Sequence, residues 1–400
     1  MMAAIRAGQL NRAVTLIEKN PILGKKLLYS GKGRCNLTNA CELDSFLRKF
    51  PRQGQFLRDA FKKFFNRDLM DFFESRGLRL KVERQLRVFP ASDRSGSIIK
   101  VLKEELQKNK VKVMYNCQMK DVSIQDNKVK GLLLKDGNTI LADRLILATG
   151  GISYGFTGST GDGIALARKL GHRVTPLRAG LVPLEVRQPY IKILAGLTLK
   201  NIRLRFDGRD RPIISDIGEL LFTDSGISGP LVLSLSGQIV DWLDEKKQVC
   251  AEIDLKPALS KEQLDSRILR EFKVNPRKGL KNILKDLLPK RLIGIFMDML
   301  GVPADKKASQ VTQQERRRLI ALLKAWRLDI VKSVPLDDAM ITRGGVSLKD
   351  IDPRTMQSRL IKGLYFAGEM VDVDADTGGF NLQAAFSTGY LAGESAALSN

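Results

Sequence analysis

The segment Gly363-Leu-Tyr-Phe-Ala-Gly-Glu-Met-Val-Asp372, followed by Thr377-Gly-Gly-Phe-Asn-Leu-Gln-Ala-Ala-Phe-Ser-Thr-Gly389, determines the architecture of this chain. Leu364 to Ala367 form a short apolar run between glycines, which predicts a buried strand. Gly378 and Gly379 follow, and without side chains they let the backbone approach a neighbouring group closely. Apolar residues then recur at helical spacing. The pattern predicts a strand, a glycine-rich turn and a helix whose amino end suits an anion or an electron-rich ring.

A second glycine site lies far upstream of the first. The run Leu145-Ile-Leu-Ala-Thr-Gly-Gly151 is another apolar strand that ends in two glycines, and Gly158-Ser-Thr-Gly-Asp-Gly163 opens a helix after it. A third double glycine occurs in Ile341-Thr-Arg-Gly-Gly345. Two strand–glycine–helix crossings so far apart predict an α/β fold with a doubly wound sheet, which folds around one extended cofactor.

The composition is that of a globular protein with an unusual charge. The 400 residues are 43% hydrophobic and 28% charged, and 67 Lys and Arg against 44 Asp and Glu give a formal net charge of +23. No run of about 18 apolar residues and no signal peptide are found, so we expect no membrane span and a cytoplasmic location. Four scattered cysteines without CxxC spacing argue against structural zinc and disulfides, and we expect no metal. The basic charge predicts a polyanionic partner, with nucleic acid first.

Two features near the start indicate where a dinucleotide would bind. The strand Val14-Thr-Leu-Ile-Glu18 ends in an acid, and an acid at this position holds ribose hydroxyls in dinucleotide-binding folds. The loop from Asn20 to Asn39 is rich in Gly, Lys, Ser and Asn. Its cations Lys25, Lys26, Lys32 and Arg34 can meet phosphates, and its glycines allow close backbone approach.

The middle of the chain differs in composition from its two ends. We predict a first part of the cofactor domain at 1–176, an inserted domain at 177–334, and a second part of the cofactor domain at 335–400. Within the insertion, 177–256 alternates as antiparallel strands do, and 257–334 is helical and strongly basic. A basic helical face can be a solvated surface or can bind nucleic acid.

These motifs, in the same order from first residue to last, resemble the BaiN/RdsA (YhiN-type) family of NAD(P)/FAD-dependent oxidoreductases. The resemblance rests on Glu18-Lys-Asn-Pro21, on Ser30-Gly-Lys-Gly-Arg-Cys-Asn-Leu-Thr-Asn39, on the three glycine sites above and on Gly226-Ile-Ser-Gly-Pro230. It implies a Rossmann-like FAD-binding domain with an inserted, mixed β-barrel and helical substrate domain. It also implies FAD as cofactor and NAD(P)H as electron donor.

The resemblance also implies the roles of single residues. Glu18 is expected to bind the adenosine ribose. The pyrophosphate–flavin path is expected to be lined by Lys26, Ser30, Gly31, Gly33, Arg34 and Asn36. The ribityl chain and flavin are expected to be wrapped by Gly368, Glu369, Asp372, Gly378, Gly379, Phe380, Asn381 and Gln383. The matching glycine site adds Thr149, Gly150 and Gly151 as cofactor-binding residues.

Three departures from the family pattern concern the cofactor site. The first strand and its GxGxxG turn are absent, since the chain starts inside the helix that should follow them, and we expect a late start codon or a fragment with weakened FAD binding. Lys32 stands where the family usually has glycine, and Gly155 replaces a common proline.

Two single residues have both a catalytic and a structural interpretation. Cys35, in the expected flavin loop, is a candidate proton donor or redox thiol, and the alternative is close packing beside the cofactor. The lone His172 lies at a helix end, where we expect a structural role.

Family and charge together indicate a function. Because a folded RNA needs a basic surface and a small apolar substrate does not, we expect an FAD-dependent reductase of a uridine C5=C6 bond in ribosomal RNA. The uridine would be extruded from its stack to reach the flavin. A small-molecule flavoenzyme, either an amine oxidase or an enone or steroid reductase, is the first alternative. An inactive RNA-binding relic is the second.

Overall fold

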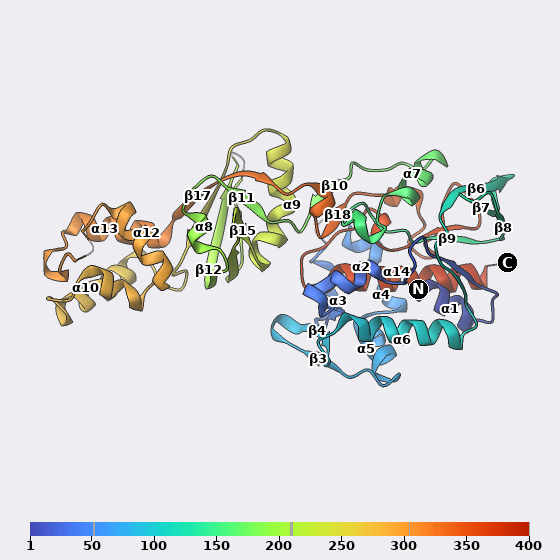
Figure 1. The fold of residues 1–400 in the computed structure, drawn as a ribbon, viewed down its shortest axis with the longest axis horizontal. Helices are drawn as coiled ribbons and strands as arrows, with labels where there is room; N and C mark the ends of the chain where they lie inside the picture. The colour runs from blue at the N-terminus through green and yellow to red at the C-terminus, as the bar shows by residue number, and fades with distance from the viewer. Residues whose placement is uncertain (51–52, 209–210, 304, 400) are drawn as a thin grey trace. The chain divides into compact units, whose positions relative to one another are not determined.

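The computed structural model describes residues 1–50, 53–208, 211–303 and 305–399 (Figure 1). The chain divides into two compact units: Met1–Gly180 with Pro335–Asn400, and the inserted Leu181–Val334. The insertion therefore begins four residues after the predicted 177 and ends at the predicted 334. Each unit has its own core of buried apolar side chains.

The first unit contains two pairs of parallel strands. β1 (Thr15–Ile17) pairs with β5 (Lys112–Met114), and β9 (Leu145–Leu147) pairs with β19 (Leu364–Phe366). β19 and the helix α14 (Phe380–Leu398) form the strand–turn–helix predicted from the sequence. The pairing of β9 with β19 brings the two distant glycine sites together. The predicted α/β class is confirmed.

Three smaller sheets complete the first unit. They are β2 (Thr38–Asn39) with β4 (Arg87–Pro90) and β3 (Leu80–Val82); β6 (Met119–Gln125) with β7 (Lys128–Leu134) and β8 (Thr139–Leu141); and β10 (Arg178–Gly180) with β18 (Ile341–Arg343). All three are antiparallel.

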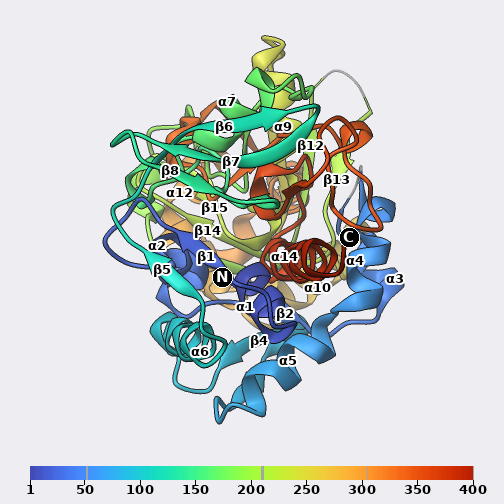
Figure 2. The same cartoon turned by 90° about the vertical axis from the view of Figure 1, so that its right-hand side faces the viewer.

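The helices of the first unit lie around these sheets, and α14 lies beside α1 (Figure 2). They are α1 (Met2–Gln9), α2 (Lys25–Tyr29), α3 (Leu43–Leu47), α4 (Arg58–Lys63), α5 (Asn66–Glu74), α6 (Ser95–Lys108) and α7 (Asp162–Lys169). The apolar residues of 44–80 recur at helical spacing, which predicts helix there, and the structure forms α3, α4 and α5 within this range. Asn66 marks one of the breaks between these helices, because its side-chain amide donates to Asn39 O at 2.7 Å and to Cys41 O at 2.8 Å.

The second unit is built on a closed antiparallel barrel. Its strands are β11 (Leu184–Val186), β12 (Thr198–Asp207), β13 (Ile213–Ile214), β14 (Gly218–Phe222), β15 (Gly226–Ser228), β16 (Val249–Asp254) and β17 (Trp326–Ser333). The order β12-β14-β15-β11-β17-β16 returns to β12, because β16 also pairs with β12. The barrel that the family resemblance implies is confirmed. Because the barrel is closed, it leaves fewer strand edges unpaired than an open sheet of the same strands would.

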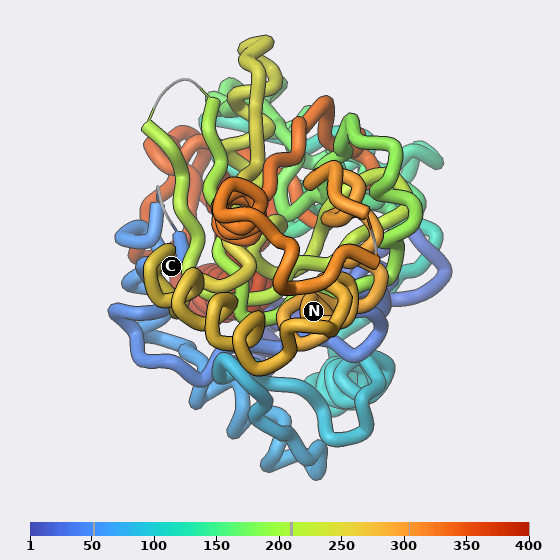
Figure 3. Tube along the Cα trace, turned by 90° about the vertical axis from the view of Figure 1, so that its left-hand side faces the viewer, coloured from blue at the N-terminus to red at the C-terminus, as the bar shows by residue number. Residues whose placement is uncertain are grey.

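Helices complete the second unit. They are α8 (Ile191–Leu194), α9 (Pro230–Asp244), α10 (Lys261–Val274), α11 (Leu280–Ile283), α12 (Lys290–Leu300) and α13 (Gln313–Lys324). The helices from α10 to α13, gold to orange in Figure 3, lie together. The predicted helical segment therefore ends at Lys324, and β17 follows it. The sequence analysis missed this strand, which closes the barrel between β11 and β16.

No helix among the described residues is both long enough and apolar enough to cross a bilayer.

Candidate functional site

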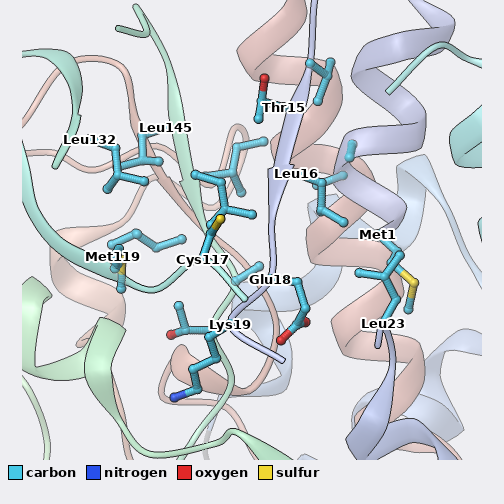
Figure 4. Close-up of a pocket in the computed structure, with 18 of the residues that line it drawn as sticks. Met1, Thr15, Leu16, Glu18, Lys19, Leu23, Cys117, Met119, Leu132 and Leu145 are labelled. Atoms are coloured by element: carbon cyan, nitrogen blue, oxygen red, sulfur yellow. The ribbon is translucent and has the colours of Figure 1, made fainter. Parts of the chain in front are cut away.

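A cavity of about 1060 Å³ lies in the first unit, at and between strands β1 and β9 (Figure 4). One end of its lining is polar. It contains Glu18, Thr149 and Gly150, which follow the carboxyl ends of the two strands, together with Lys26 of α2 and Asp162 of α7. The carboxyl edge of a parallel sheet is where ligands bind in doubly wound folds. The cavity thus unites four of the residues that the sequence predicts to bind a cofactor.

The Glu18 carboxylate is held in place by its own loop. Its Oε1 accepts hydrogen bonds from Asn20 N at 2.9 Å and from Asn20 Nδ2 at 2.8 Å. Asn20 Nδ2 also donates to Thr157 O at 3.0 Å, which ties this loop to the turn before α7. A fixed carboxylate at the end of a strand can accept hydrogen bonds from two vicinal hydroxyls, as a ribose presents them.

The amino end of α1 lines the same cavity through Met1, Ala3 and Ala4. Burial lowers the pKa of the Met1 amino group to about 6, and the nearby Glu18 opposes this shift. The end of a helix presents backbone N–H groups and the positive end of the helix dipole. This part of the lining therefore suits an anionic group.

Four side chains join strand β18 and the loops after β9 and β19 to helix α2. Lys26 Nζ donates to Glu369 Oε2 at 2.6 Å and to Ser153 Oγ at 2.8 Å, and Ser153 Oγ donates to Glu369 Oε1 at 3.3 Å. Thr342 N donates to Glu369 Oε1 at 2.9 Å. Thr342 Oγ1 in turn accepts from Ile152 N at 2.8 Å. The network fixes the Lys26 ammonium at the edge of the cavity.

Ser153 and Thr342 are members of this network that the sequence analysis did not single out. Both lie beside glycine motifs that it did single out, but a hydroxyl side chain has no characteristic spacing of its own. A Cβ at Gly151 would lie 2.2 Å from Thr342 Oγ1. The second glycine of that motif therefore makes room for Thr342, a contact that only the fold reveals.

The turn before α14 is built against the chain at β2. Gly379 has φ of 97°, and a Cβ there would lie 2.5 Å from both the carbonyl carbon and oxygen of Thr38. With its amide oxygen toward Gly379 N, Asn36 accepts a hydrogen bond from that N–H at 3.1 Å. Asn39 Nδ2 donates to Gly378 O at 3.3 Å. The close approach that the glycine pair predicts is thus made, in this structure, to the protein's own backbone.

Gln383 and Cys35 are both fully buried, at 0% exposure. Gln383 Oε1 accepts from Thr38 Oγ1 at 2.7 Å, and its Nε2 donates to Ser387 Oγ at 2.9 Å. Cys35 has φ of 60°, and burial raises the pKa of its thiol to about 12, partly offset by a hydrogen bond with Ser30. A thiol with such a pKa is protonated at neutral pH. The roles predicted for both residues stay predictions.

Arg34 is engaged at the surface of its loop. It forms ion pairs with Glu83 and Asp93, and its guanidinium lies 4.2 Å from the centre of the Phe89 ring. The two carboxylates raise the pKa of Arg34 above its ordinary value through hydrogen bonds. This arrangement stiffens the loop that carries Cys35.

The other predicted residues are placed by local contacts. Asn381 Oδ1 accepts from Ala375 N at 3.0 Å, and Asn381 Nδ2 donates to Ala375 O at 2.9 Å. The Phe380 ring packs edge-to-face on the Phe46 ring, with the ring centres 4.7 Å apart. Gly368 N donates to Thr388 Oγ1 at 3.0 Å. Among the other predicted residues, Ser30 Oγ donates to Leu27 O at 2.7 Å, and Asp372 N donates to Val346 O at 3.1 Å. Gly31 and Gly33 both have a positive φ.

Among the described residues, no three His, Cys, Asp or Glu side chains gather in a way that could hold a metal ion.

The chain is similar to several known proteins over nearly its whole length. A family model described as "HI0933-like protein Rossmann domain" matches residues 1–395. A protein of Clostridium scindens named 3-dehydro-bile acid delta(4,6)-reductase is 33% identical, over 99% of this chain and 96% of its own. A protein of Escherichia coli named ribosomal RNA dihydrouridine synthase is 30% identical, over 98% of this chain and 93% of its own.

Solved structures share the fold. The 3-ketosteroid delta1-dehydrogenase of Sterolibacterium denitrificans aligns with a TM-score of 0.53 and 12% identity, covering 100% of this chain and 97% of its own. An apo Sdh1 complex of Mycobacterium smegmatis aligns with a TM-score of 0.51 and 17% identity, covering 99% of this chain and 66% of its own. At such identities the alignments establish the fold alone.

Proposed function

Because the chain belongs to the HI0933-like family of Rossmann-domain proteins, we propose that it is an FAD-dependent oxidoreductase that reduces a carbon–carbon double bond. We propose further that the substrate is a uridine of ribosomal RNA and that NAD(P)H is the electron donor. The relatives from Clostridium scindens and Escherichia coli carry names of a reductase and of a dihydrouridine synthase, which supports the class of reaction.

The cavity offers groups that match the parts of FAD. Glu18 has the chemistry to accept the ribose hydroxyls, and the amino end of α1 has the chemistry to bind the diphosphate. A Cβ at Gly150 would lie 3.3 Å from Ser159 Oγ, so a glycine keeps this side of the cavity open. The cavity, at about 1060 Å³, is as large as the upper end of the range of about 300–1,000 Å³ that is usual for ligand sites.

The residues of the chain would position the cofactor and handle a proton. When bound, FAD supplies the hydride, and one proton completes the saturated bond. Lys26, fixed by Glu369 and Ser153, offers a cation to the negatively charged part of the cofactor. Cys35 is the proton donor that we propose: burial raises the pKa of its thiol to about 12, so the thiol is protonated at neutral pH and gives its proton only to a strongly basic atom, such as the substrate carbon that is left as a carbanion after hydride addition.

The charge of the insertion is the observation that favours RNA as the substrate. Residues 257–334 contain 18 Lys and Arg against 8 Asp and Glu. The exposed cations that form no ion pair within the described part of the chain include Arg270, Lys273, Arg277, Lys281, Lys285, Lys290, Arg317 and Arg318. A phosphate backbone would neutralise them, whereas a small apolar substrate would leave them without a function.

Mass spectrometry of ribosomal RNA tests this function. We expect that RNA from a strain lacking the protein has lost one dihydrouridine, and that the purified protein with NADH or NADPH restores it. Unchanged dihydrouridine in the deletion strain would contradict the proposal. RNA treated with the Glu369→Gln protein is the matched control, because this variant keeps the basic helices and loses a partner of Lys26.

A small-molecule reductase is the second candidate. The named bile acid reductase is, at 33%, slightly more similar to this chain than the RNA-modifying relatives at 30%. This candidate predicts turnover of a 3-oxo-4,6-diene steroid in the absence of RNA, at rates that do not change with salt. The RNA candidate predicts no such turnover.

A further inference from the structure

Tyr29 and Phe156 are the two most exposed aromatic residues among those that the structure describes, at 53% and 56%. Their ring centres lie 5.1 Å apart with the rings nearly perpendicular, and the Tyr154 ring lies 5.7 Å from that of Phe156. A single exposed apolar residue needs no explanation, whereas exposed aromatic rings that contact one another are candidates for an interaction site. Tyr29 and Phe156 are termed the aromatic platform below.

The loop that carries Phe156 is fixed in an unusual backbone conformation. Tyr154 has a φ of 54°, which is uncommon for a residue other than glycine and has to be maintained by its surroundings. Its N–H donates to Asp337 O at 2.7 Å, and Gly155 N donates to Asp337 Oδ1 at 2.9 Å. Thr157 is buried, and its N–H donates to Tyr154 O at 2.8 Å. The Phe156 ring is therefore presented from a well-held backbone.

Three neighbouring contacts join this loop to helix α2. Lys26 Nζ donates to Ser153 Oγ at 2.8 Å, Lys25 Nζ donates to Phe156 O, and the Tyr29 ring meets the Phe156 ring. Lys25 and Lys26 line the large cavity, but the two rings are not among its lining residues. The aromatic platform thus lies outside the cavity, next to the network that fixes Lys26 at its edge. A ring bound there would not compete with a cofactor in the cavity.

Two departures from the family pattern, Lys32 and Gly155, lie in the segments that carry the platform. Lys32 follows Tyr29 by three residues in the turn η1 (Ser30–Gly33), is exposed, and forms no ion pair within the described part of the chain. At position 155 a proline would have no N–H to donate to Asp337, and a Cβ there would lie 2.6 Å from Asp337 Oδ1. The glycine therefore permits the contact that holds the Phe156 loop, and the lysine adds a free positive charge.

We propose that the aromatic platform stacks one unpaired base of the RNA substrate and that Lys32 binds a phosphate beside this base. The inference rests on the proposed function, because it takes RNA as the substrate. Unpaired bases stack on aromatic side chains, and every base offers a flat face for such a contact. A lysine that meets the neighbouring phosphate fixes the strand without reading its sequence.

The exposure of the platform favours a polymer over a free nucleotide. Small ligands bind in sites that bury about 70–90% of their surface. Tyr29 and Phe156 are more than half exposed, so a nucleotide that rests on them alone would remain largely in solvent. An RNA that is held by further contacts brings its base to the platform at a high effective concentration, and a weak stacking contact then suffices. The platform would steady a nucleotide near the target uridine while the uridine leaves its own stack.

Photocrosslinking to 5-iodouridine tests the platform in the unchanged protein. The probe is a single-stranded RNA of about 12 nucleotides made of 5-iodouridine, a length within the range of about 4–16 nucleotides that single-strand sites cover. Irradiated iodouracil forms crosslinks with aromatic side chains on which it stacks. We expect the crosslinked peptides, identified by mass spectrometry, to contain Tyr29 or Phe156. Crosslinks confined to other residues, or no crosslinks, would overturn the proposal.

The affinity for the same RNA gives a second reading. We expect the double change Tyr29→Leu and Phe156→Leu, which removes both rings and keeps apolar side chains, to weaken binding by about tenfold or more. Tyr115→Leu is the matched control, since Tyr115 is 39% exposed and lies outside the platform, and it should leave the affinity unchanged. Lys32→Gln should reduce the slope of log affinity against log salt by about 0.7.

Three results would contradict the platform or its lysine. Unchanged affinity in the double variant, or equal weakening by Tyr115→Leu, would overturn the stacking contact. Weaker binding of NADH with unchanged binding of RNA in the double variant would assign the rings to the electron donor and would also overturn it. An unchanged salt slope in Lys32→Gln would overturn the phosphate contact.

The outcome is separable from that of the proposed function. If the deletion strain has lost a dihydrouridine but no crosslink forms at Tyr29 or Phe156, the function stands and the platform is wrong. If crosslinks form there but dihydrouridine is unchanged in the deletion strain, the platform stands and the function is wrong.

Discussion

Lys26 is the residue on which we expect FAD binding to depend most. Its ammonium and the Glu369 carboxylate are 27% and 21% exposed, so their ion pair adds little to stability. We expect Lys26→Met to lower the flavin content of the purified protein by about tenfold or more and to shift Tm by less than about 3 °C. The ratio of flavin to protein absorbance measures the flavin content, and thermal unfolding measures Tm.

Lys100→Met is the matched control. Lys100 lies on α6 with its Nζ 3.9 Å from Glu104, and both side chains are well exposed. An equal loss of flavin in this variant would show that the effect comes from charge alone and not from the site of Lys26.

His172 makes the stability of the protein depend on pH. The ring is 2% exposed, with Nε2 2.7 Å from Ser358 Oγ and Nδ1 3.1 Å from Ala167 O, and burial lowers its pKa below the usual value. A lowered pKa favours the neutral ring in the folded state, so the contribution to stability is present above about pH 6.5 and is lost as pH falls.

The variant His172→Gln removes this titration. We expect its free energy of unfolding to change less between pH 7 and pH 5 than that of the unchanged protein, as measured by urea unfolding at several pH values. If the free energy of unfolding changed equally with pH in both proteins, the lowered pKa of His172 would be contradicted. The contacts of the ring support the structural role that the sequence analysis gave this residue.

Single residues were predictable where a pattern ties them to a strand end. Glu18 follows a short apolar strand, and the structure places it in the cavity. Ser153 and Thr342 were not predictable, because their contacts with Glu369 depend on loops that are far apart in sequence. The glycine pair before α14 was found correctly, but the neighbour it approaches, Thr38, could be known only from the fold.

Among the structural elements, the turn before α14 gives a sharp test of packing. Gly379→Ala would place a methyl group 2.5 Å from the carbonyl of Thr38 and would hold alanine at a φ of 97°. We expect a loss of about 3 kcal/mol or more in the free energy of unfolding. Chemical denaturation measures it.

Gly77→Ala is the matched control for this prediction. Gly77 has a φ of 80°, but a Cβ there has no atom within 4 Å. This variant should therefore lose only the conformational term of about 1–2 kcal/mol. If Gly379→Ala and Gly77→Ala lose the same free energy of unfolding, the close approach to Thr38 adds no further destabilisation.

Strands and helices were predictable where their pattern was local. The strand β17 was missed because its alternation of buried and exposed residues follows directly on a long run of basic helices. The division of residues 43–74 into short helices was missed because Asn66 binds Asn39 and Cys41, a tertiary contact with no local signal. In both cases the local pattern was outweighed by pairing with a distant segment.

At the scale of the whole molecule, the net charge predicts how RNA binding responds to salt. Arg317 and Arg318 of α13 are exposed, whereas Arg316 forms an ion pair with Asp265 at 2.6 Å. We expect the double change Arg317→Gln and Arg318→Gln to reduce the slope of log affinity against log salt by about 1–2, since each phosphate contact contributes about 0.7–0.9. Binding of ribosomal RNA at several salt concentrations measures this slope.

Arg316→Gln is the control in the same turn of helix. It removes a cation that is already neutralised, so the salt slope should stay the same even if stability falls. Equal slopes in all three proteins would show that α13 does not meet the RNA.

The charge of +23 was visible in the sequence, and so was its concentration between residues 257 and 334. Which cations are available could not be known, because Arg316 and Arg291 are engaged by Asp265 and by the carbonyl of Ala195, respectively. Composition therefore predicts the kind of partner, and the fold selects the residues that can meet it.

The pairing of β11 with β17 has a consequence for how this protein could have evolved. Leu184, near the entry to the insertion, lies opposite Ser333, near its exit, so the chain leaves and returns at one place. A segment with adjacent ends can be exchanged between genes as a cassette, because closing the chain across the junction needs only a short link. Under the proposed function, in which the insertion meets the substrate, recognition can then diverge while the Rossmann framework is inherited, and relatives named for a bile acid and for ribosomal RNA can share one fold.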